Sequence, residues 1–134
     1  MGAVAALAVA LSPTACDGCE KTAAAFIHYG AASVMFAILA YFCLGPFRRH
    51  TAGKGGKRGL RARIYGLCGW TIILCMVTEV TATVAWTYGV GIPAGITFWT
   101  ESIALGAFGV AWIVSGKHLR LFAEADELAP RPLA

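Results

Sequence analysis

The sequence has few charged residues for its length. Only 13% of its 134 residues are Asp, Glu, Lys or Arg, whereas roughly 25% is usual in soluble globular domains. A soluble domain of this size needs polar side chains to cover its large surface, yet 58% of the residues are apolar. The composition therefore excludes an ordinary soluble globule, a disordered chain and a small secreted disulfide-rich protein. It indicates a polytopic membrane protein.

Motifs for common cofactors are also missing. The glycine-rich basic segment 48–63 lacks the GK[ST] ending and the preceding strand of a phosphate-binding loop. Cys19 is followed by Glu20, so the sequence has no C-x-x-C-H haem-attachment motif. No cofactor is indicated by a specific motif, no catalytic set is recognisable, and the sequence favours a protein that is not an enzyme.

Three apolar stretches are long enough to predict transmembrane helices. A helix needs about 20 apolar residues to cross a hydrocarbon core of roughly 30 Å. The stretches run from about 22 to 44, 64 to 88 and 98 to 115. We expect the first to end at Gly45-Pro46, because proline cannot continue the hydrogen-bond ladder of a helix.

The N-terminal apolar segment is shorter. Residues 1–11 rise only about 17 Å as a helix, so this segment is half of a longer helix, a short span in a thinned bilayer, or a re-entrant or interfacial segment. A signal sequence is disfavoured, because no basic residue precedes the apolar run. We predict an all-α membrane bundle of three full transmembrane helices plus a short N-terminal helix of about 1–13. Residues 1–118 form one transmembrane domain in this prediction.

The basic residues predict the orientation of the chain. Seven of the eleven Lys and Arg residues lie in one connection, and basic connections stay in the cytoplasm. We therefore expect this connection and the tail 119–134 to be cytoplasmic. Its glycines suggest a flexible linker, and its basic side chains are predicted to contact lipid headgroups rather than nucleic acid. These residues are Arg48, Arg49, Lys54, Lys57, Arg58, Arg61 and Arg63.

Three ionisable residues fall within the predicted spans: His28, Glu79 and Glu101. Such residues are costly in a membrane and are candidate functional residues. Their distances from the predicted helix ends place all three in the outer half of the membrane, where they could form one cluster. The hypotheses are a ligand pocket, a proton relay, a metal site, or a buried hydrogen-bonded pair that fixes helix packing.

Helical periodicity predicts which faces meet. A carboxyl group is not expected to face lipid, so the stripe that carries each ionisable residue should face protein. On the last span, the predicted inner stripe is Glu101, Leu105, Phe108, Trp112 and Ser115; on the second, it is Cys68, Ile72, Cys75, Glu79, Thr83 and Trp86; on the first, it is His28, Ala31, Ala32, Met35 and Leu39.

A C-x-x-C pair precedes the first full span. Cys16 and Cys19 lie in the connection predicted to face the outer side. In an oxidising compartment they could form a structural disulfide, act as a redox-active pair, or supply half of a metal site completed by His28 or a carboxylate.

Several short motifs occur in a characteristic order along the chain. They include His28 followed by Ala31-Ala32, Arg63-Ile64-Tyr65, and Phe98-Trp99 followed by Glu101. In this order the chain resembles an uncharacterised family of bacterial polytopic inner-membrane proteins, over about residues 3–118. The resemblance implies no known activity. It implies further spans before the N-terminal segment in other members, and it marks His28, Arg63, Tyr65 and Glu101 as positions of the family pattern.

Two functions are consistent with these patterns. The first is a non-enzymatic accessory or structural subunit of a larger complex in the bacterial inner membrane, in contact with lipids and with other membrane subunits. The alternative is a thiol-redox or metal-handling protein that uses Cys16, Cys19 and the intramembrane His/Glu cluster.

Overall fold

The computed structural model describes residues 2–12, 23–51 and 55–116, and its regular elements are all helical. In chain order they are α1 (Gly2–Leu11), α2 (Ala23–Phe42), the π-helical turn η1 (Cys43–Phe47), α3 (Gly56–Thr87) and α4 (Ile96–Ser115). Three helical stretches are long and apolar enough to cross a membrane: Ala23–Phe47, Gly56–Thr87 and Ile96–Ser115. The prediction of an all-α membrane bundle with a short additional N-terminal helix is confirmed.

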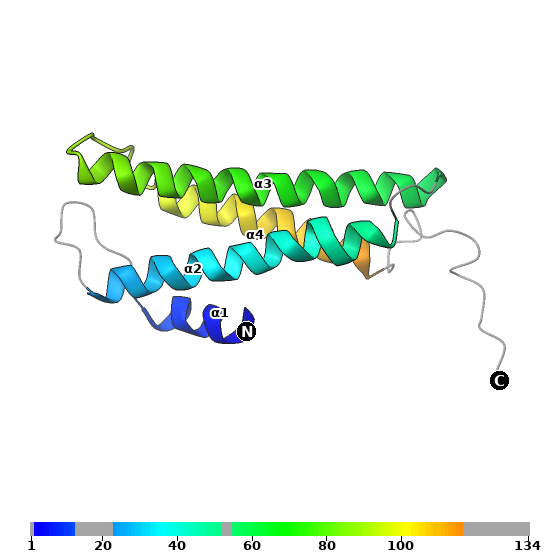
Figure 1. Cartoon of the computed structure of the whole chain (residues 1–134), viewed down its shortest axis with the longest axis horizontal. Coiled ribbons are helices and arrows are strands. Elements are labelled where there is room, and N and C mark those ends of the chain that lie inside the picture. The colour runs from blue at the N-terminus through cyan, green and yellow to red at the C-terminus, as the bar shows by residue number, and fades with distance from the viewer. Residues whose placement is uncertain (1, 13–22, 52–54, 117–134) are drawn as a thin grey trace.

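The long helices run along one another, and α1 lies at the side of the bundle (Figure 1). Among the described elements, α3 packs against α4, α2 and η1, whereas α1 contacts only α2. The core consists mainly of small and medium side chains, which let helices approach closely in a membrane. These are Ala32, Phe36, Ala40 and Cys43 from α2 and η1, Tyr65, Cys68 and Ile72 from α3, and Ala104, Ala111 and Val114 from α4.

The prediction that Gly45-Pro46 ends the first full span was wrong. The helix continues through η1, and both Phe42 and Arg48, which flank it, have right-handed helical dihedral angles. Proline removes one N–H donor and crowds the carbonyl of the preceding turn, and a wider π-helical turn accommodates such a disruption. The turn also places the ring of Phe47 5.6 Å from Tyr65 and 6.2 Å from Trp112, so tertiary packing supports it.

The predicted flexible linker is also corrected, because α3 begins at Gly56 rather than near residue 64. Lys57, Arg58, Leu60 and Arg61 favour helix, and Arg61 and Ala62 are buried. The 32 residues of α3 rise about 48 Å, which exceeds a hydrocarbon core of roughly 30 Å. The first turns of α3 therefore extend beyond the membrane-spanning length and carry basic residues with them.

The predicted inner stripe of α4 was wrong by one residue. The buried residues are Thr100, Ala104, Ala111 and Val114, while Leu105 is 48% exposed and Trp112 is 62% exposed. One residue corresponds to a rotation of about 100°. Alanine and threonine at the interface allow α4 to lie closer to α3 than the bulky stripe would, and the large side chains then face outwards.

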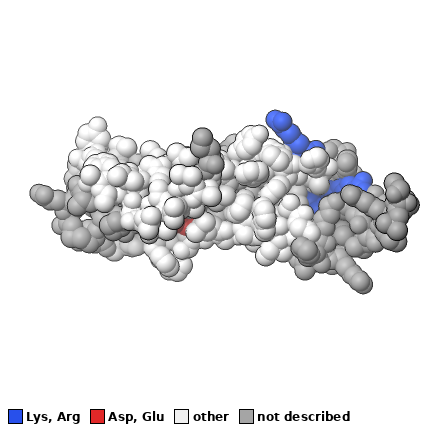
Figure 2. All heavy atoms as spheres, turned by 90° about the horizontal axis from the view of Figure 1, so that it is seen from below, with Lys and Arg blue, Asp and Glu red and all other residues white. Residues whose placement is uncertain are grey.

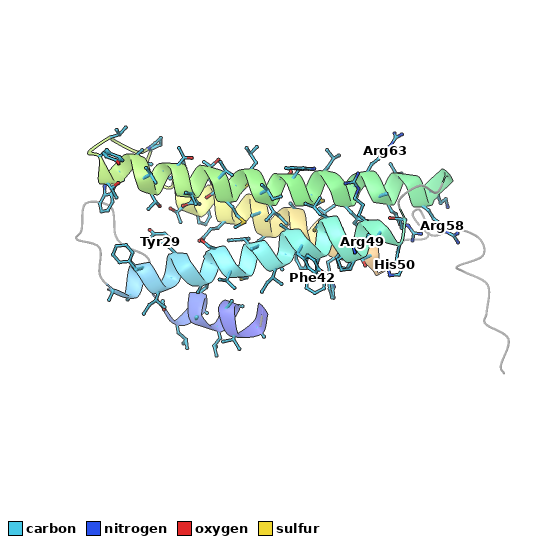
Figure 3. The ribbon with its side chains drawn as sticks, viewed as in Figure 1. Tyr29, Phe42, Arg49, His50, Arg58 and Arg63 are labelled. Atoms are coloured by element: carbon cyan, nitrogen blue, oxygen red, sulfur yellow. The ribbon has the colours of Figure 1, made fainter. Side chains whose placement is uncertain are left out.

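The described basic residues gather at one end of the bundle (Figure 2). Arg49, His50, Arg58 and Arg63 lie together there, at the end opposite Tyr29 (Figure 3). Arg61 differs from the other described basic residues in that it is only 2% exposed, so protein covers it and it does not extend towards headgroups. Lys54 lies outside the described residues.

Candidate functional site

His28 occupies a buried position between α1, α2 and α4. The residue is 6% exposed, and its Nδ1 lies 2.8 Å from the carbonyl oxygen of Ser12 and 3.2 Å from that of Val9. The last carbonyls of a helix have no partner within the helix. The Nδ1–H of His28 therefore donates to the end of α1 and fixes this short helix against the bundle.

The other ring nitrogen of His28 faces α4. Its Nε2 lies 3.5 Å from Oε1 of Glu101, and it has no other hydrogen-bond partner among the described atoms. Since Nδ1 carries a proton for the carbonyls, Nε2 is an acceptor in the neutral ring and a donor in the charged ring. A charged His28 ring therefore pairs with a Glu101 carboxylate, and a neutral ring pairs with a protonated Glu101.

Glu79 lies on α3, where two hydroxyl groups of α4 reach it. Thr97 donates to one carboxyl oxygen at 3.3 Å, and Thr100 donates to the other. The Thr100 hydroxyl also lies within hydrogen-bond distance of the carbonyl oxygen of Ile96, at 2.9 Å. A protonated Glu79 could donate to the Thr100 oxygen while the threonine proton turns to Ile96, so the arrangement satisfies either protonation state.

The two threonines were missed by sequence analysis, which treated residues 89–97 as a connection. Thr97 and Thr100 are three residues apart. Helical spacing of three to four residues puts such groups on one face. The pattern therefore could have been found if the last helix had been extended to Ile96, where it begins.

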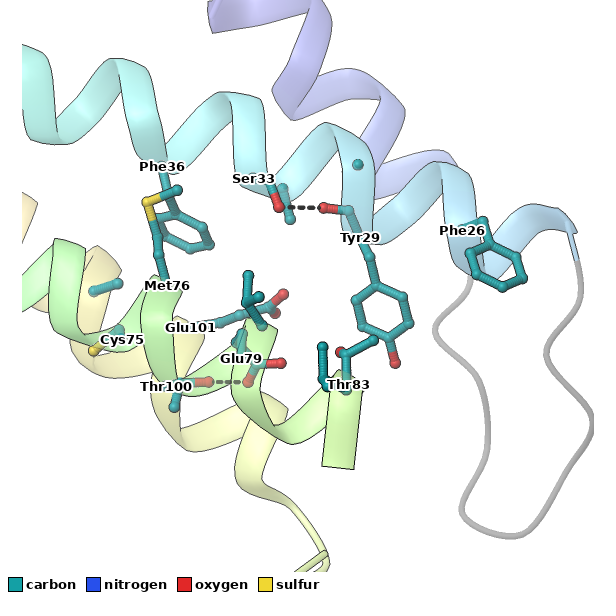
Figure 4. A pocket seen from close by; sticks show the side chains of 15 residues that line it. Phe26, Tyr29, Ser33, Phe36, Cys75, Met76, Glu79, Thr83, Thr100 and Glu101 are labelled. Atoms are coloured by element: carbon teal, nitrogen blue, oxygen red, sulfur yellow. Dashed lines mark hydrogen bonds between the residues drawn. The ribbon is translucent and has the colours of Figure 1, made fainter. Parts of the chain in front are cut away.

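Both glutamates line one pocket between α2, α3 and α4 (Figure 4). The pocket has a volume of about 290 Å³. Its walls are mostly apolar and include the rings of Phe26, Tyr29 and Phe36 and the side chain of Met76. The carboxyl groups of Glu79 and Glu101 are the strongest hydrogen-bond acceptors in this lining.

The structure thus brings together the three ionisable residues of the predicted cluster. His28 contacts Glu101, and Glu101 and Glu79 share the pocket. Both α2 and α4 begin at the end of the bundle away from the labelled basic residues (Figures 1 and 3), and His28 and Glu101 each lie within the first two turns of their helix.

The cysteines are divided between described and undescribed parts of the chain. Cys16 and Cys19 lie outside the described residues. Cys43 and Cys68 are buried in the core as free thiols, and Cys75 lines the pocket on the side of α3. Within residues 2–12, 23–51 and 55–116, no three side chains of His, Cys, Asp or Glu come together as a metal site would require.

A comparison of the chain with protein-family profiles, with curated proteins and with solved structures found no match.

Proposed function

We propose that this multi-pass membrane protein is a non-enzymatic subunit that packs through α4 against a transmembrane helix of a larger assembly. The observation that carries the proposal is the outer face of α4. Ser102, Gly106 and Gly109 follow one another at spacings of four and three residues, on the side opposite the buried Ala104 and Ala111. A Cβ atom added at either glycine would meet nothing within 4 Å.

Glycine inside a helix costs about 1 kcal/mol relative to alanine, and no contact among the described residues uses the space at these positions. Small residues at this spacing allow the backbones of two membrane helices to approach closely. The exposed apolar side chains of Leu105 on one side and Val110 on the other flank the small residues. The face therefore presents a strip of small residues between apolar side chains, which suits a second helix.

The proposal includes a location in the bacterial inner membrane, with the basic end and the tail 119–134 in the cytoplasm. It is supported by the basic residues that gather at one end of the described bundle, because short cytoplasmic connections carry an excess of Lys and Arg. Membership of the uncharacterised inner-membrane family, suggested by the motif order, is part of the same proposal.

Purification from native membranes in a mild detergent tests the proposal. The tagged chain should elute as a complex larger than one copy in its micelle, and Gly106→Leu should release it. Leu67→Phe is the control, because it adds bulk at a residue that is 70% exposed but lies on α3. A monodisperse single copy, or a complex that survives Gly106→Leu, would contradict the proposal.

A second candidate function is thiol-redox or metal handling. It is favoured by the contact between the His28 ring and the Glu101 carboxyl group, since imidazole and carboxylate are both metal ligands. Alkylation of Cys16 and Cys19 with and without reductant, together with metal analysis of the purified protein, tests it. Cysteines that never change redox state in a protein that holds no metal would contradict it.

A further inference from the structure

The pocket between α2, α3 and α4 has an unbalanced set of charges. Its lining contains the carboxyl groups of Glu79 and Glu101 and no Lys or Arg. Within residues 2–12, 23–51 and 55–116, the one basic group in contact with either carboxyl group is His28, through Nε2. Tyr29 and Cys75 are the remaining titratable side chains in the lining, and neither becomes positive.

The cluster of Glu79, Glu101 and His28 needs one more positive charge to be neutral when both carboxyl groups are ionised. With both carboxyl groups ionised and His28 protonated, the three groups carry one net negative charge. An uncompensated charge at membrane depth is strongly unfavourable. Among the described residues, no basic group other than His28 approaches the two carboxyl groups. A proton or one monovalent cation would neutralise it.

The shape of the pocket favours a cation with an apolar body. The rings of Phe26, Tyr29 and Phe36 line it. Figure 4 shows Phe36 and Tyr29 on either side of the two carboxyl groups, with Phe26 farther out beyond Tyr29. Aromatic faces attract cations within about 6 Å, and apolar walls exclude the water that a small inorganic ion would retain. The volume of about 290 Å³ is near the lower end of the range for small-molecule sites.

A second cavity continues the pocket along the same two helices. It has a volume of about 720 Å³, lies between α2, η1 and α3, and shares Met76 and Val80 with the first. Its lining is mostly apolar, and its polar side chains are Tyr41, Thr81 and, at the far end, Arg49. Arg49 repels a cationic headgroup, so a charged head is directed to the glutamates and an alkyl chain to the groove.

We infer that the Glu79–Glu101 pocket binds one monovalent amphiphilic organic cation in exchange for one proton. The cationic head lies between the two carboxyl groups, and the apolar tail lies in the groove lined by Ala37, Leu44, Ile73 and Val77. The exchange balances, because the bound cation replaces one positive charge and the proton passes to water.

Binding of radiolabelled decyltrimethylammonium to the purified full chain in detergent tests the inference. Decyldimethylamine oxide is the control probe, since it has the same tail and is neutral at pH 7. The ammonium should bind at least about tenfold more tightly than the amine oxide. In unbuffered solution one proton should be released per cation bound. At pH values low enough to protonate the free site, the affinity should fall about tenfold for each further unit of pH decrease.

Two variants locate the site. Glu79→Gln and Glu101→Gln should each lower the affinity for the ammonium about tenfold or more and leave that for the amine oxide unchanged, because glutamine keeps the shape and removes the charge. Thr78→Val, on α3 outside the pocket lining, should bind like the native chain. Circular dichroism and gel filtration identify any variant that fails to fold. If a variant fails to fold, the measurement of proton release from the native chain tests the inference in its place.

Equal binding of the two probes, ammonium binding without proton release, or native affinity in folded Glu79→Gln and Glu101→Gln would each overturn the inference.

Discussion

Substitution of Gly69 by alanine probes the closest approach between α3 and η1. Gly69 is buried on α3, and a Cβ atom there would lie 2.6 Å from Cγ and 2.7 Å from Cδ2 of Leu44, and 3.2 Å from Cβ of Cys43. Such separations are too short for carbon atoms, so either the leucine or the helix must move. The π-helical turn that carries Leu44 is itself held by packing of Phe47.

The expected magnitude follows from two opposing effects. Overpacking of a close-packed interface costs about 1–3 kcal/mol, while glycine to alanine in a helix contributes up to about 1 kcal/mol in the other direction. At Gly109 only the second effect operates, because an added Cβ would meet nothing within 4 Å. Since the helix-forming contribution cancels between the two variants, Gly69→Ala should be less stable than Gly109→Ala by about 1–3 kcal/mol.

Unfolding of each variant in mixed SDS and dodecylmaltoside micelles, followed by far-ultraviolet circular dichroism, measures this difference. Leu44→Ala provides a further control, because it removes the atoms that the new methyl group would meet. In the Leu44→Ala background the penalty of Gly69→Ala should therefore shrink, with a coupling free energy of about 0.5–3 kcal/mol.

Two results would refute the reasoning. One is equal stability of Gly69→Ala and Gly109→Ala within about 0.5 kcal/mol. The other is a Gly69→Ala penalty that stays the same when Leu44 is truncated, which would show that the close approach is not what limits this position.

Three further predictions follow from the site and the orientation. Thr100→Val should lower the unfolding free energy by about 1–3 kcal/mol, because Glu79 loses a donor, while Thr100→Ser should stay near native; equal losses in micelle unfolding would contradict this. His28→Phe should raise hydrogen exchange in α1 and leave α3 protected, because α1 loses its link to the bundle; unchanged exchange would argue against that link. A fluorescent protein fused after Ala134 should fluoresce in the cytoplasm, whereas an active alkaline phosphatase at this position would show the reverse orientation.

Much of the architecture could be predicted because membrane insertion depends on local composition. The length and apolarity of each span, and the short N-terminal helix, are properties of contiguous residues, and the structure confirms them within a few residues for α4 and for the end of α3. Depth along a helix is likewise local, since each residue adds a fixed rise. This is why His28, Glu79 and Glu101 could be expected at similar levels.

The two wrong predictions of helix bounds concern segments where tertiary packing opposes a local sequence preference. Pro46 breaks an isolated helical ladder, yet the chain continues through η1 with Phe47 packed against Tyr65. The glycine-rich segment before residue 64 predicted a linker, but α3 begins at Gly56, and Arg61 and Ala62 within it are buried. In both cases contacts distant in sequence outweigh a modest local preference.

By itself, the sequence determined that this chain is a helical membrane protein with three full spans, a basic end and ionisable groups at membrane depth. Only the tertiary structure decided how the helices are rotated. Rotation placed Ala104 and Ala111 rather than Leu105 and Trp112 in the core, and it brought Glu79 and Glu101 into one pocket. The physical reason is that insertion depends on the sum of side-chain transfer energies along a segment, whereas rotation depends on how side chains of different helices fit together.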